Sequence, residues 1–219
     1  MPTPASTRAP RAGTPPRLLI ASSNAGKLRE YRALARAAPA NLALDIALVP
    51  RFSELAPFDE AAPTFAENAA GKALHYSRLG APDGLVLADD SGLVVPALGG
   101  APGVHSARYA APGASDAQCV AKLLRELARS GATDRRARFV CDLALAGKGG
   151  ILAVVSDLVE GEIAAAPRGS EGFGYDPVFF FPALGKTFAE LPRVQKNRLS
   201  HRGKAFRKLL EFLASPAVL

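Results

Sequence analysis

The chain has 219 residues, of which 48% are hydrophobic, so it can form one large domain or two small ones with a sizeable core. No apolar run approaches the roughly 18 residues of a membrane helix, and the first residues lack the apolar segment of a secretory signal, so we expect a cytoplasmic protein without a membrane partner. The net charge of +7 comes from scattered lysines and arginines, which favours an anionic small molecule over a stable nucleic-acid complex.

The composition divides the chain into a short tail and one folded unit. Residues 1–16 are rich in Pro, Ala, Thr and Arg without hydrophobic periodicity, so we expect a disordered tail. Residues 17–219 contain no clear linker and no internal repeat, which favours a single domain. Cys119 and Cys141 are far apart and form no C-x-x-C pair, so neither zinc nor redox chemistry is indicated and a reducing compartment is the default.

The first half of the chain alternates between apolar runs and amphipathic segments. The pattern predicts a strand over residues 17–22, a helix over 27–38 and a second strand over 44–49. Thr64 and Glu67 have the spacing of a capping box, which predicts a helix from there to about Arg78. Asn68 and Lys72 are four residues apart on this helix and so point the same way.

Two adjacent carboxylates follow the next apolar run. Residues 85–88 read as a buried strand that stops at Asp89-Asp90-Ser91-Gly92. Because side chains alternate along a strand, we expect Asp89 and Asp90 to point in different directions and to have different roles. A metal site or an acid/base site is one interpretation, and a solvated turn is the other.

The second half adds a hairpin and two helices. Ser115 and Gln118 form a second capping box before an apolar helical stripe. Strand-like runs over 138–146 and 151–163 are joined by a Gly-rich turn, which predicts a hairpin, and residues 177–181 read as a short strand. Ser200 has the position of a cap for the last helix. Together these elements predict an α/β protein with a mixed sheet flanked by helices.

A candidate phosphate loop lies between the first strand and the first helix. It reads Ser22, Ser23, Asn24, Ala25, Gly26 and Lys27. Backbone N–H groups at a helix N-terminus bind anions, and a glycine lets a phosphate approach the main chain. It is not a P-loop, because Ala21 and Leu28 stand where that motif needs Gly and Ser or Thr. An ordinary strand-to-helix turn is the alternative.

The segment Gly172-Phe173-Gly174-Tyr175-Asp176-Pro177 is a candidate for base recognition. Two glycines flank Phe173, so its ring is a candidate for stacking on a base, although a ring tucked into the core is the alternative. Asp176 precedes a proline, which favours an extended conformation that holds its carboxylate at the start of the next strand.

Basic residues gather near the start of the last helix, where Lys196 is followed by Ser200, His201 and Arg202. Positive side chains in a first helical turn oppose the helix dipole, which favours ligand contact over a merely solvated helix start. His75 and His105 show no partner in the sequence and are taken as ordinary residues.

Four ordered blocks, residues 22–27, 64–72, 88–109 and 172–202, resemble the inosine triphosphate pyrophosphatase family, the dITP/XTP pyrophosphatases. The resemblance spans roughly residues 17–213. It implies an elongated two-lobed fold with the active site in a central cleft, a homodimer, and Mg²⁺-dependent hydrolysis of ITP, dITP or XTP to the monophosphate and pyrophosphate. The alternatives are a related house-cleaning pyrophosphatase for other modified nucleotides and a nucleotide-binding module without activity.

The resemblance also implies residue roles. Asp90 would accept the proton of the attacking water, and Glu60 and Asp90 would hold the magnesium. The substrate would be bound by Ser22, Ser23, Asn24, Ala25, Gly26, Lys27, Lys72, Ser91, Arg108, Phe173, Gly174, Tyr175, Asp176, Lys196, His201 and Arg202. The chain departs from the family at Ser22-Ser23-Asn24, where Thr-Gly-Asn or Thr-Asn-Asn is common, but the first hydroxyl is kept.

Overall fold

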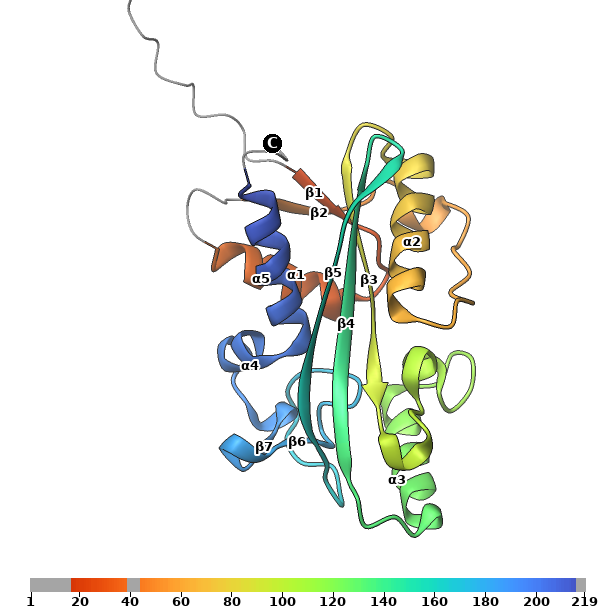
Figure 1. Ribbon diagram of the computed structural model, residues 1–219, viewed down its shortest axis with the longest axis vertical. Helices are drawn as coiled ribbons and strands as arrows, with labels where there is room; N and C mark the ends of the chain where they lie inside the picture. The colour runs from red at the N-terminus through yellow and green to blue at the C-terminus, as the bar shows by residue number, and fades with distance from the viewer. Residues whose placement is uncertain (1–16, 39–43, 216–219) are drawn as a thin grey trace, which may run out of the picture.

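Three long neighbouring strands run along the longest axis of the molecule and are shared by an upper and a lower lobe (Figure 1). The computed structural model describes residues 17–38 and 44–215. Their sheet has seven strands in the order β2-β1-β3-β4-β5-β6-β7, with β1 parallel to β2 and β3 and all later pairs antiparallel. The predicted mixed sheet is therefore confirmed. The strands are β1 (Arg17–Ile20), β2 (Asp45–Leu48), β3 (Leu85–Val94), β4 (Arg136–Gly147), β5 (Gly150–Ile163), β6 (Phe179–Phe181) and β7 (Lys186–Thr187).

Helices cover both faces of the upper part of the sheet (Figure 1). One apolar cluster joins α1 and α5 to the sheet, a second joins α2 to the other face, and a third fills the lower lobe around α3. Strand alternation explains the division, because Leu18 and Ile20 of β1 enter the first cluster and Leu19 enters the second. The α-helices of the described residues are α1 (Ala25–Arg36), α2 (Phe65–Gly80), α3 (Asp116–Ser130), α4 (Arg193–Leu199) and α5 (His201–Leu213).

The strand that carries the two carboxylates is longer than predicted. The expectation that it stops at Asp89 is wrong, because β3 continues to Val94 and pairs with β4 along its length, with Asp90 opposite Asp142. The backbone N–H and C=O groups of the polar residues after Ala88 bond to β4, which keeps them in a strand instead of a turn. The predicted alternation is confirmed. Leu87 belongs to the α1 and α5 side of the sheet and Ala88 to the α2 side, so Asp89 and Asp90 face opposite helices.

The helix caps agree with the sequence. Thr64 Oγ1, Ser115 Oγ and Ser200 Oγ each accept a hydrogen bond from a backbone N–H in the first turn of α2, α3 and α5. In α2, however, Glu67 accepts from the Thr64 hydroxyl, so of the two predicted capping boxes the one formed by Ser115 and Gln118 is complete. The predicted hairpin is also confirmed, with Gly147 paired to Gly150.

Some local predictions differ from the structure. The strand expected over 177–181 is shortened to Phe179–Phe181, because the N–H groups of Val178 and Phe179 bond to Tyr175 O in a turn. The short helix α4 and the 3₁₀ helix η4 (Gly103–Arg108) carry no strong hydrophobic period and were not predicted. The tail expected over residues 1–16 lies outside the described residues.

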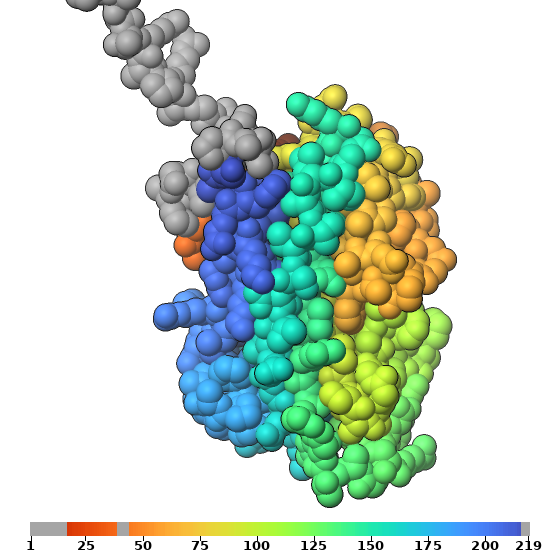
Figure 2. Space-filling view, viewed as in Figure 1, coloured from red at the N-terminus to blue at the C-terminus, as the bar shows by residue number. Residues whose placement is uncertain are grey.

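The outer face of β5 is open to solvent. Figure 2 shows β5 exposed between α5 and the α2 side of the molecule. Leu152, Val154 and Leu158 project from it and are 43%, 46% and 37% exposed, and the polar Ser156, Glu160 and Glu162 are exposed beside them. Within the part of the chain that the structure describes, every helix is too short or too polar to cross a membrane.

Candidate active site

A cavity of about 670 Å³ is lined by residues from widely separated parts of the chain. Its wall is built from the β1–α1 loop, the segment before α2, β3, η4, the start of α3, the 173–176 loop, α4 and α5. The cavity brings together residues that are up to 180 positions apart. The predicted residues that line it are Ser22, Ser23, Asn24, Lys27, Glu60, Lys72, Asp90, Ser91, Phe173, Gly174, Tyr175, Asp176, Lys196, His201 and Arg202.

The loop before α1 is partly occupied by its own hydrogen bonds. Asn24 Oδ1 caps α1 by accepting from Lys27 N at 3.1 Å, and Ser22 Oγ accepts from Asn24 N at 3.1 Å. Ala25 and Gly26 lie outside the cavity wall. A Cβ at Gly26 would come within 2.9 Å of the Phe173 ring. The structure therefore shows an aromatic ring against this glycine, where the sequence suggested a phosphate.

Asp89 faces α1 and α5, where it meets two cations. Lys27 Nζ lies 3.0 Å and Arg202 Nε 3.4 Å from its Oδ2. Burial alone would raise the pKa of this carboxyl, but Lys27 and Arg202 outweigh burial and hold it well below its usual range. Its Oδ1 is buried without a hydrogen-bond donor from residues 17–38 and 44–215. Asp89 is therefore an ionised group that fixes Lys27 and Arg202.

Asp90 faces α2 and has the opposite electrostatic environment. Asn68 Nδ2 donates to its Oδ2 at 3.0 Å, and its own neighbour Ser91 N donates to Oδ1 at 3.0 Å. Burial and the nearby Glu60 carboxylate raise the pKa of Asp90 to about 6. A carboxylate with this pKa is a stronger base than an ordinary aspartate.

Glu60 reaches the cavity from the segment between β2 and α2. Lys72 Nζ contacts its Oε1 at 2.5 Å. Arg108 lies outside the cavity wall but donates from Nη2 to Glu60 O at 2.9 Å, and its Nη1 is 4.0 Å from Glu60 Oε2. The structure thus places the predicted Arg108 behind Glu60.

The Glu60 and Asp90 carboxylates fit a shared divalent ion. They line the same cavity, and Glu60 raises the pKa of Asp90, so the two negative groups are close enough to repel each other. No group of three or more His, Cys, Asp or Glu side chains in residues 17–38 and 44–215 is arranged to hold a metal alone. Mg²⁺ is usually held by one or two carboxylates together with substrate phosphates, which matches this donor set.

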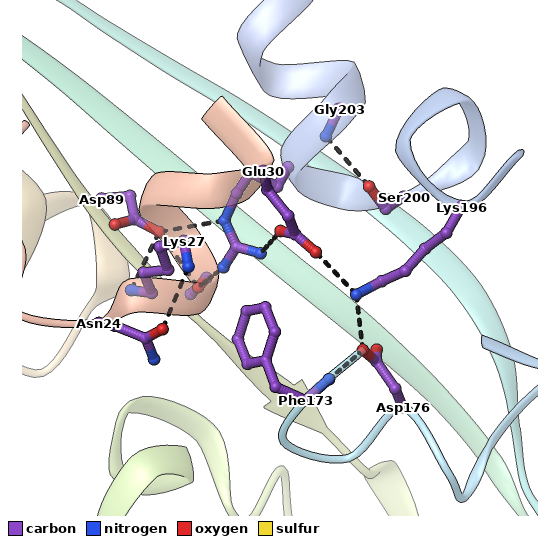
Figure 3. A network of polar contacts seen from close by, with 11 residues as sticks. Asn24, Lys27, Glu30, Asp89, Phe173, Asp176, Lys196, Ser200 and Gly203 are labelled. Carbon is purple, nitrogen blue, oxygen red and sulfur yellow. Dashed lines mark hydrogen bonds and ion pairs between the residues drawn. The ribbon is translucent and has the colours of Figure 1, made fainter. Parts of the chain in front are cut away.

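The sequence missed a buried glutamate outside the cavity wall that pairs with two of the wall's cations. Glu30 on α1 accepts from Lys196 Nζ at 2.8 Å and from Arg202 Nη1 at 2.5 Å, and Lys196 also contacts Asp176 Oδ2 at 2.6 Å (Figure 3). Burial would raise the pKa of Glu30, but Arg202 and Lys196 lower it. The sequence signal that could have identified Glu30 was its position three residues after Lys27, which places both side chains on neighbouring positions of α1, and Glu30 is on the buried face of that helix.

The contacts of Lys196 and Arg202 show whether these basic residues near the start of α5 are solvated or buried. Arg202 is buried in the first turn of α5, and Glu30 and Asp89 match its charge while Ser91 Oγ accepts from Nη2 at 2.8 Å. Lys196 is equally buried. Both side chains have internal partners and also line the cavity, so they are not a solvated helix start.

The cavity wall carries no net charge. It contains four cations and four carboxylates, and a nucleoside triphosphate adds several negative charges to this balance. Such a ligand would bring negative charge that the wall alone does not offset. The charged wall residues are Lys27, Lys72, Lys196, Arg202, Glu60, Asp90, Asp116 and Asp176.

Phe173 is neither freely exposed nor part of the core. Its half-buried ring lies 4.9 Å from Lys196 Nζ and 5.5 Å from Arg202 Cζ, and its N–H donates to Asp176 Oδ2 at 2.8 Å (Figure 3). Gly174 N donates to Asp116 Oδ2 at 2.6 Å. The sequence did not identify Asp116, which serves as an anchor for this loop.

His201 is held by packing. Its ring stacks on Phe139 with centroids 4.6 Å apart, and its Nδ1 is buried without a partner among the described residues. Burial, together with Arg202 and Lys196, lowers the pKa of His201 well below 6.5, so the ring is neutral at pH 7. Tyr175, also in the wall, donates from its hydroxyl to Ser106 O at 2.8 Å.

Comparison with known proteins gives consistent results. The sequence profile of the Ham1 family matches residues 18–212. The chain is 51% identical over 195 residues to a dITP/XTP pyrophosphatase of Geobacillus kaustophilus, covering 89% of this chain and 92% of that relative. It is 52% identical over 205 residues to a dITP/XTP pyrophosphatase of Bordetella parapertussis, covering 90% and 91%. The solved structure of a HAM1 protein from Coxiella burnetii superposes with a TM-score of 0.80 at 40% identity, covering 90% and 98%.

Proposed function

This chain belongs to the Ham1 family, and on that premise we propose that it is a nucleoside triphosphate pyrophosphohydrolase acting on ITP, dITP and XTP. The products are the nucleoside monophosphate and pyrophosphate, and the reaction removes non-standard purines from the nucleotide pool. The relatives named dITP/XTP pyrophosphatase support this substrate class. The structural observation that carries it is the pair of carboxylates, Glu60 and Asp90, that converge beside Lys72 in the cavity.

Magnesium is the proposed metal, held by Glu60 and Asp90 together with phosphate oxygens of the substrate. When bound, such an ion neutralises phosphate charge and polarises water and phosphoryl oxygens. The neutral balance of the cavity wall supports the need for this ion.

Asp90 is the proposed proton acceptor for the attacking water. Its pKa of about 6 leaves it largely ionised at pH 7 to 8 while keeping it more basic than an exposed aspartate. Asn68 orients the carboxylate from α2.

Phosphate binding is assigned to the β1–α1 loop and to two lysines. Asp89 holds Lys27 in place through an ion pair, and Glu60 holds Lys72 in the same way. For Lys72, burial would lower the pKa, but Glu60 raises it, so the ammonium persists in the cavity. Preorganised cations of this kind stabilise charge that develops on transferring phosphoryl groups.

The purine is assigned to the opposite part of the wall, with Phe173 as a stacking surface and His201 and Arg202 as hydrogen-bond donors. A 6-oxo purine accepts hydrogen bonds from these donors. A 6-amino purine offers no acceptor at that position. Because Arg202 keeps Glu30, Asp89 and Ser91 as partners, the cost of about 1 to 3 kcal/mol for an unpaired buried donor then applies to His201. We therefore expect ATP to be a poor substrate.

The proposal extends to a single domain over residues 17–219, a homodimer, a cytoplasmic location and the absence of a stable nucleic-acid partner. The family resemblance supports the dimer, and the scattered distribution of basic residues supports the last point. Sedimentation velocity on the purified full chain tests the dimer.

One assay tests the activity. The purified protein is incubated with Mg²⁺ and ITP, XTP, dTTP, GTP or ATP, and pyrophosphate and orthophosphate are measured separately. We expect pyrophosphate from ITP and XTP, and none after chelation with EDTA. Orthophosphate from ATP, or no turnover of ITP and XTP, contradicts the proposal. Preferential turnover of dTTP favours another house-cleaning pyrophosphatase, and binding of ITP without turnover favours a nucleotide-binding module.

A further inference from the structure

Glu60 lies on a segment with little regular structure of its own. Residues 51–62, which we name the strap, run from the end of β2 towards α2 and contain only the short 3₁₀ helix Phe52–Glu54. The strap lies beside α2 in Figure 1, and its Phe52, Leu55 and Phe58 line the cavity together with Glu60. Because backbone hydrogen bonds within the strap are few, its position depends on side chains that hold it.

Arg108 of η4 donates to Glu60 O of the strap, and three other side chains that bond to the strap backbone come from α2. Asn68 accepts from Ala62 N at 3.0 Å and donates to Ala62 O at 3.2 Å. Tyr76 Oη accepts from Phe58 N at 3.3 Å. His75 Nε2 lies 2.7 Å from Ala56 O. Glu60 therefore sits between two anchored points, and its own carboxylate meets Lys72 of the same helix.

The strap also packs closely on α2. A Cβ at Gly71 would come within 2.6 Å of Phe58 Cζ, so the glycine is what allows this approach. The His75 ring is 5.7 Å from the Phe58 ring and meets the Tyr76 ring edge-on at 4.8 Å between centroids. His75 thus combines a polar anchor with an aromatic contact in the middle of the strap.

The hydrogen bond of His75 has one direction. Ala56 O can only accept, so Nε2 must carry the proton, and this holds for the neutral Nε2–H tautomer and for the imidazolium alike. His75 lies outside the cavity wall and so does not reach the substrate. Any effect on the reaction must pass through the strap.

We propose that His75 is a positioning residue for Glu60, which holds the strap on α2 so that the Glu60 carboxylate converges with Asp90. The proposal rests on the proposed role of Glu60 as a metal ligand. Without the anchor, binding the metal must also order the strap, and that cost lowers metal affinity. The reacting groups themselves stay in place, so the chemical step at saturating metal is preserved.

Two substitutions of His75 separate the hydrogen bond from the bulk of the side chain. His75→Gln retains an N–H donor that can reach Ala56 O, whereas His75→Leu retains bulk and removes the donor. Tyr76→Phe provides a second variant, which removes the acceptor for Phe58 N but, unlike the changes at His75, alters a residue of the cavity wall. Arg78→Ala is the matched control on the exposed face of α2.

The readouts are the Mg²⁺ concentration for half-maximal ITP turnover, kcat at saturating Mg²⁺, and the thermal shift that Mg²⁺ produces without nucleotide. For His75→Leu and Tyr76→Phe we expect the half-maximal Mg²⁺ concentration to rise about tenfold, as for other groups that orient a metal ligand. We expect kcat to stay within about twofold and the Mg²⁺-induced thermal shift to shrink. His75→Gln and Arg78→Ala should behave like the unmodified protein.

Glu60→Gln distinguishes failure of this proposal from failure of the proposed function. If Glu60→Gln raises the Mg²⁺ requirement but His75→Leu and Tyr76→Phe do not, the positioning role is wrong and the metal site stands. If Glu60→Gln leaves the Mg²⁺ requirement unchanged, the assigned metal ligand is wrong and the positioning role fails with it. A drop in kcat without a change in Mg²⁺ requirement in His75→Leu also contradicts the positioning role.

Discussion

Asp89 and Asp90 are neighbours in the chain, yet their pKa values move in opposite directions. The reason is that β3 turns Asp89 towards Lys27 and Arg202 and turns Asp90 towards Glu60. One carboxylate is therefore ionised at neutral pH and fixes two cations, whereas the other is a stronger base. The two roles differ because adjacent residues of a strand point to opposite faces of the sheet.

Substitution of Asp90 should remove turnover and stabilise the metal-free protein. In Asp90→Asn the neutral amide cannot act as a base, and the buried charge opposed by Glu60 is gone. Because ionised Asp90 is unfavourable in the fold, we expect a gain of about 1 to 2 kcal/mol at pH 7, a rise in Tm of a few degrees. Differential scanning calorimetry in EDTA checks this, with an ITP assay on the same sample.

The stability gained by Asp90→Asn should decrease as the pH falls. The pKa of Asp90 is raised in the fold, so its penalty is full above about pH 6 and absent below its ordinary value of 3.8. The difference in Tm between the two proteins should therefore shrink as the pH falls from 7 to 4. A difference that grows on acidification, or full activity of Asp90→Asn, contradicts the assignment.

Glu30 should matter more for stability than its absence from any motif suggests. Glu30→Gln leaves Lys196 and Arg202 with one carboxylate fewer in a buried network, and breaking a buried ion pair in this way costs about 3 to 5 kcal/mol. Urea unfolding at pH 7 measures the loss. The exposed Glu67→Gln on α2 is the control and should change stability by less than about 1 kcal/mol.

At the scale of elements, α1 and the 173–176 loop meet at one close contact. The Phe173 ring occupies the space beside Gly26, and it also lies near Lys196 and Arg202. The glycine therefore determines how far the ring reaches over the cavity wall. This contact connects the upper lobe, where α1 lies, with the loop proposed to stack on the purine.

Gly26→Ala should weaken substrate binding through this contact. The new methyl group would come within 2.9 Å of the ring and of Asn24 Oδ1, so both must move. We expect the KM for ITP to rise about fivefold or more while kcat changes less, because the displaced ring is assigned to binding. Steady-state kinetics tests this against Gly150→Ala, where a Cβ meets nothing within 4 Å. Equal effects of the two substitutions contradict the prediction.

At the scale of the whole molecule, a continuous network of buried charges joins the lobes. It runs from Lys27 through Asp89, Arg202, Glu30 and Lys196 to Asp176, and so connects α1, β3, α5 and α4 with the loop before β6. Within it, the pKa of Glu30 and that of Asp89 are both lowered by their cations. The cohesion of the cavity wall therefore depends on these carboxylates staying ionised.

The network predicts an acid limit to stability. Carboxyls with lowered pKa values stabilise the fold fully above their ordinary values near pH 4, and this stability is lost as the pH falls through their lowered values. We expect unfolding free energy to fall steeply below about pH 4. Circular dichroism during urea unfolding from pH 6 to pH 3 measures it, and Glu30→Gln should show a shallower decline because it has one such group fewer. An equal or steeper decline contradicts the role of Glu30.

The sequence by itself determined most helices and strands and the residue types of the candidate site. Apolar period and capping residues predicted the helices, the hairpin and the mixed sheet, because these signals act over a few residues. Strand alternation was enough to separate Asp89 from Asp90, and four ordered motifs were enough to indicate the family. The predicted end of the β3 strand failed because its continuation depends on pairing with β4, which starts more than 40 residues later.

Only the tertiary structure decided which charges meet. Glu30 contacts residues 166 and 172 positions away, His75 holds a strap carrying a proposed metal ligand, and Gly26 admits a ring from Phe173. No local pattern encodes these partners, because burial and pairing of charged groups depend on how the α1, α4 and α5 helices pack around β3. The two carboxylates of β3 were visible in the sequence, but the cations and the opposing glutamate that give them different pKa values come together only in the fold.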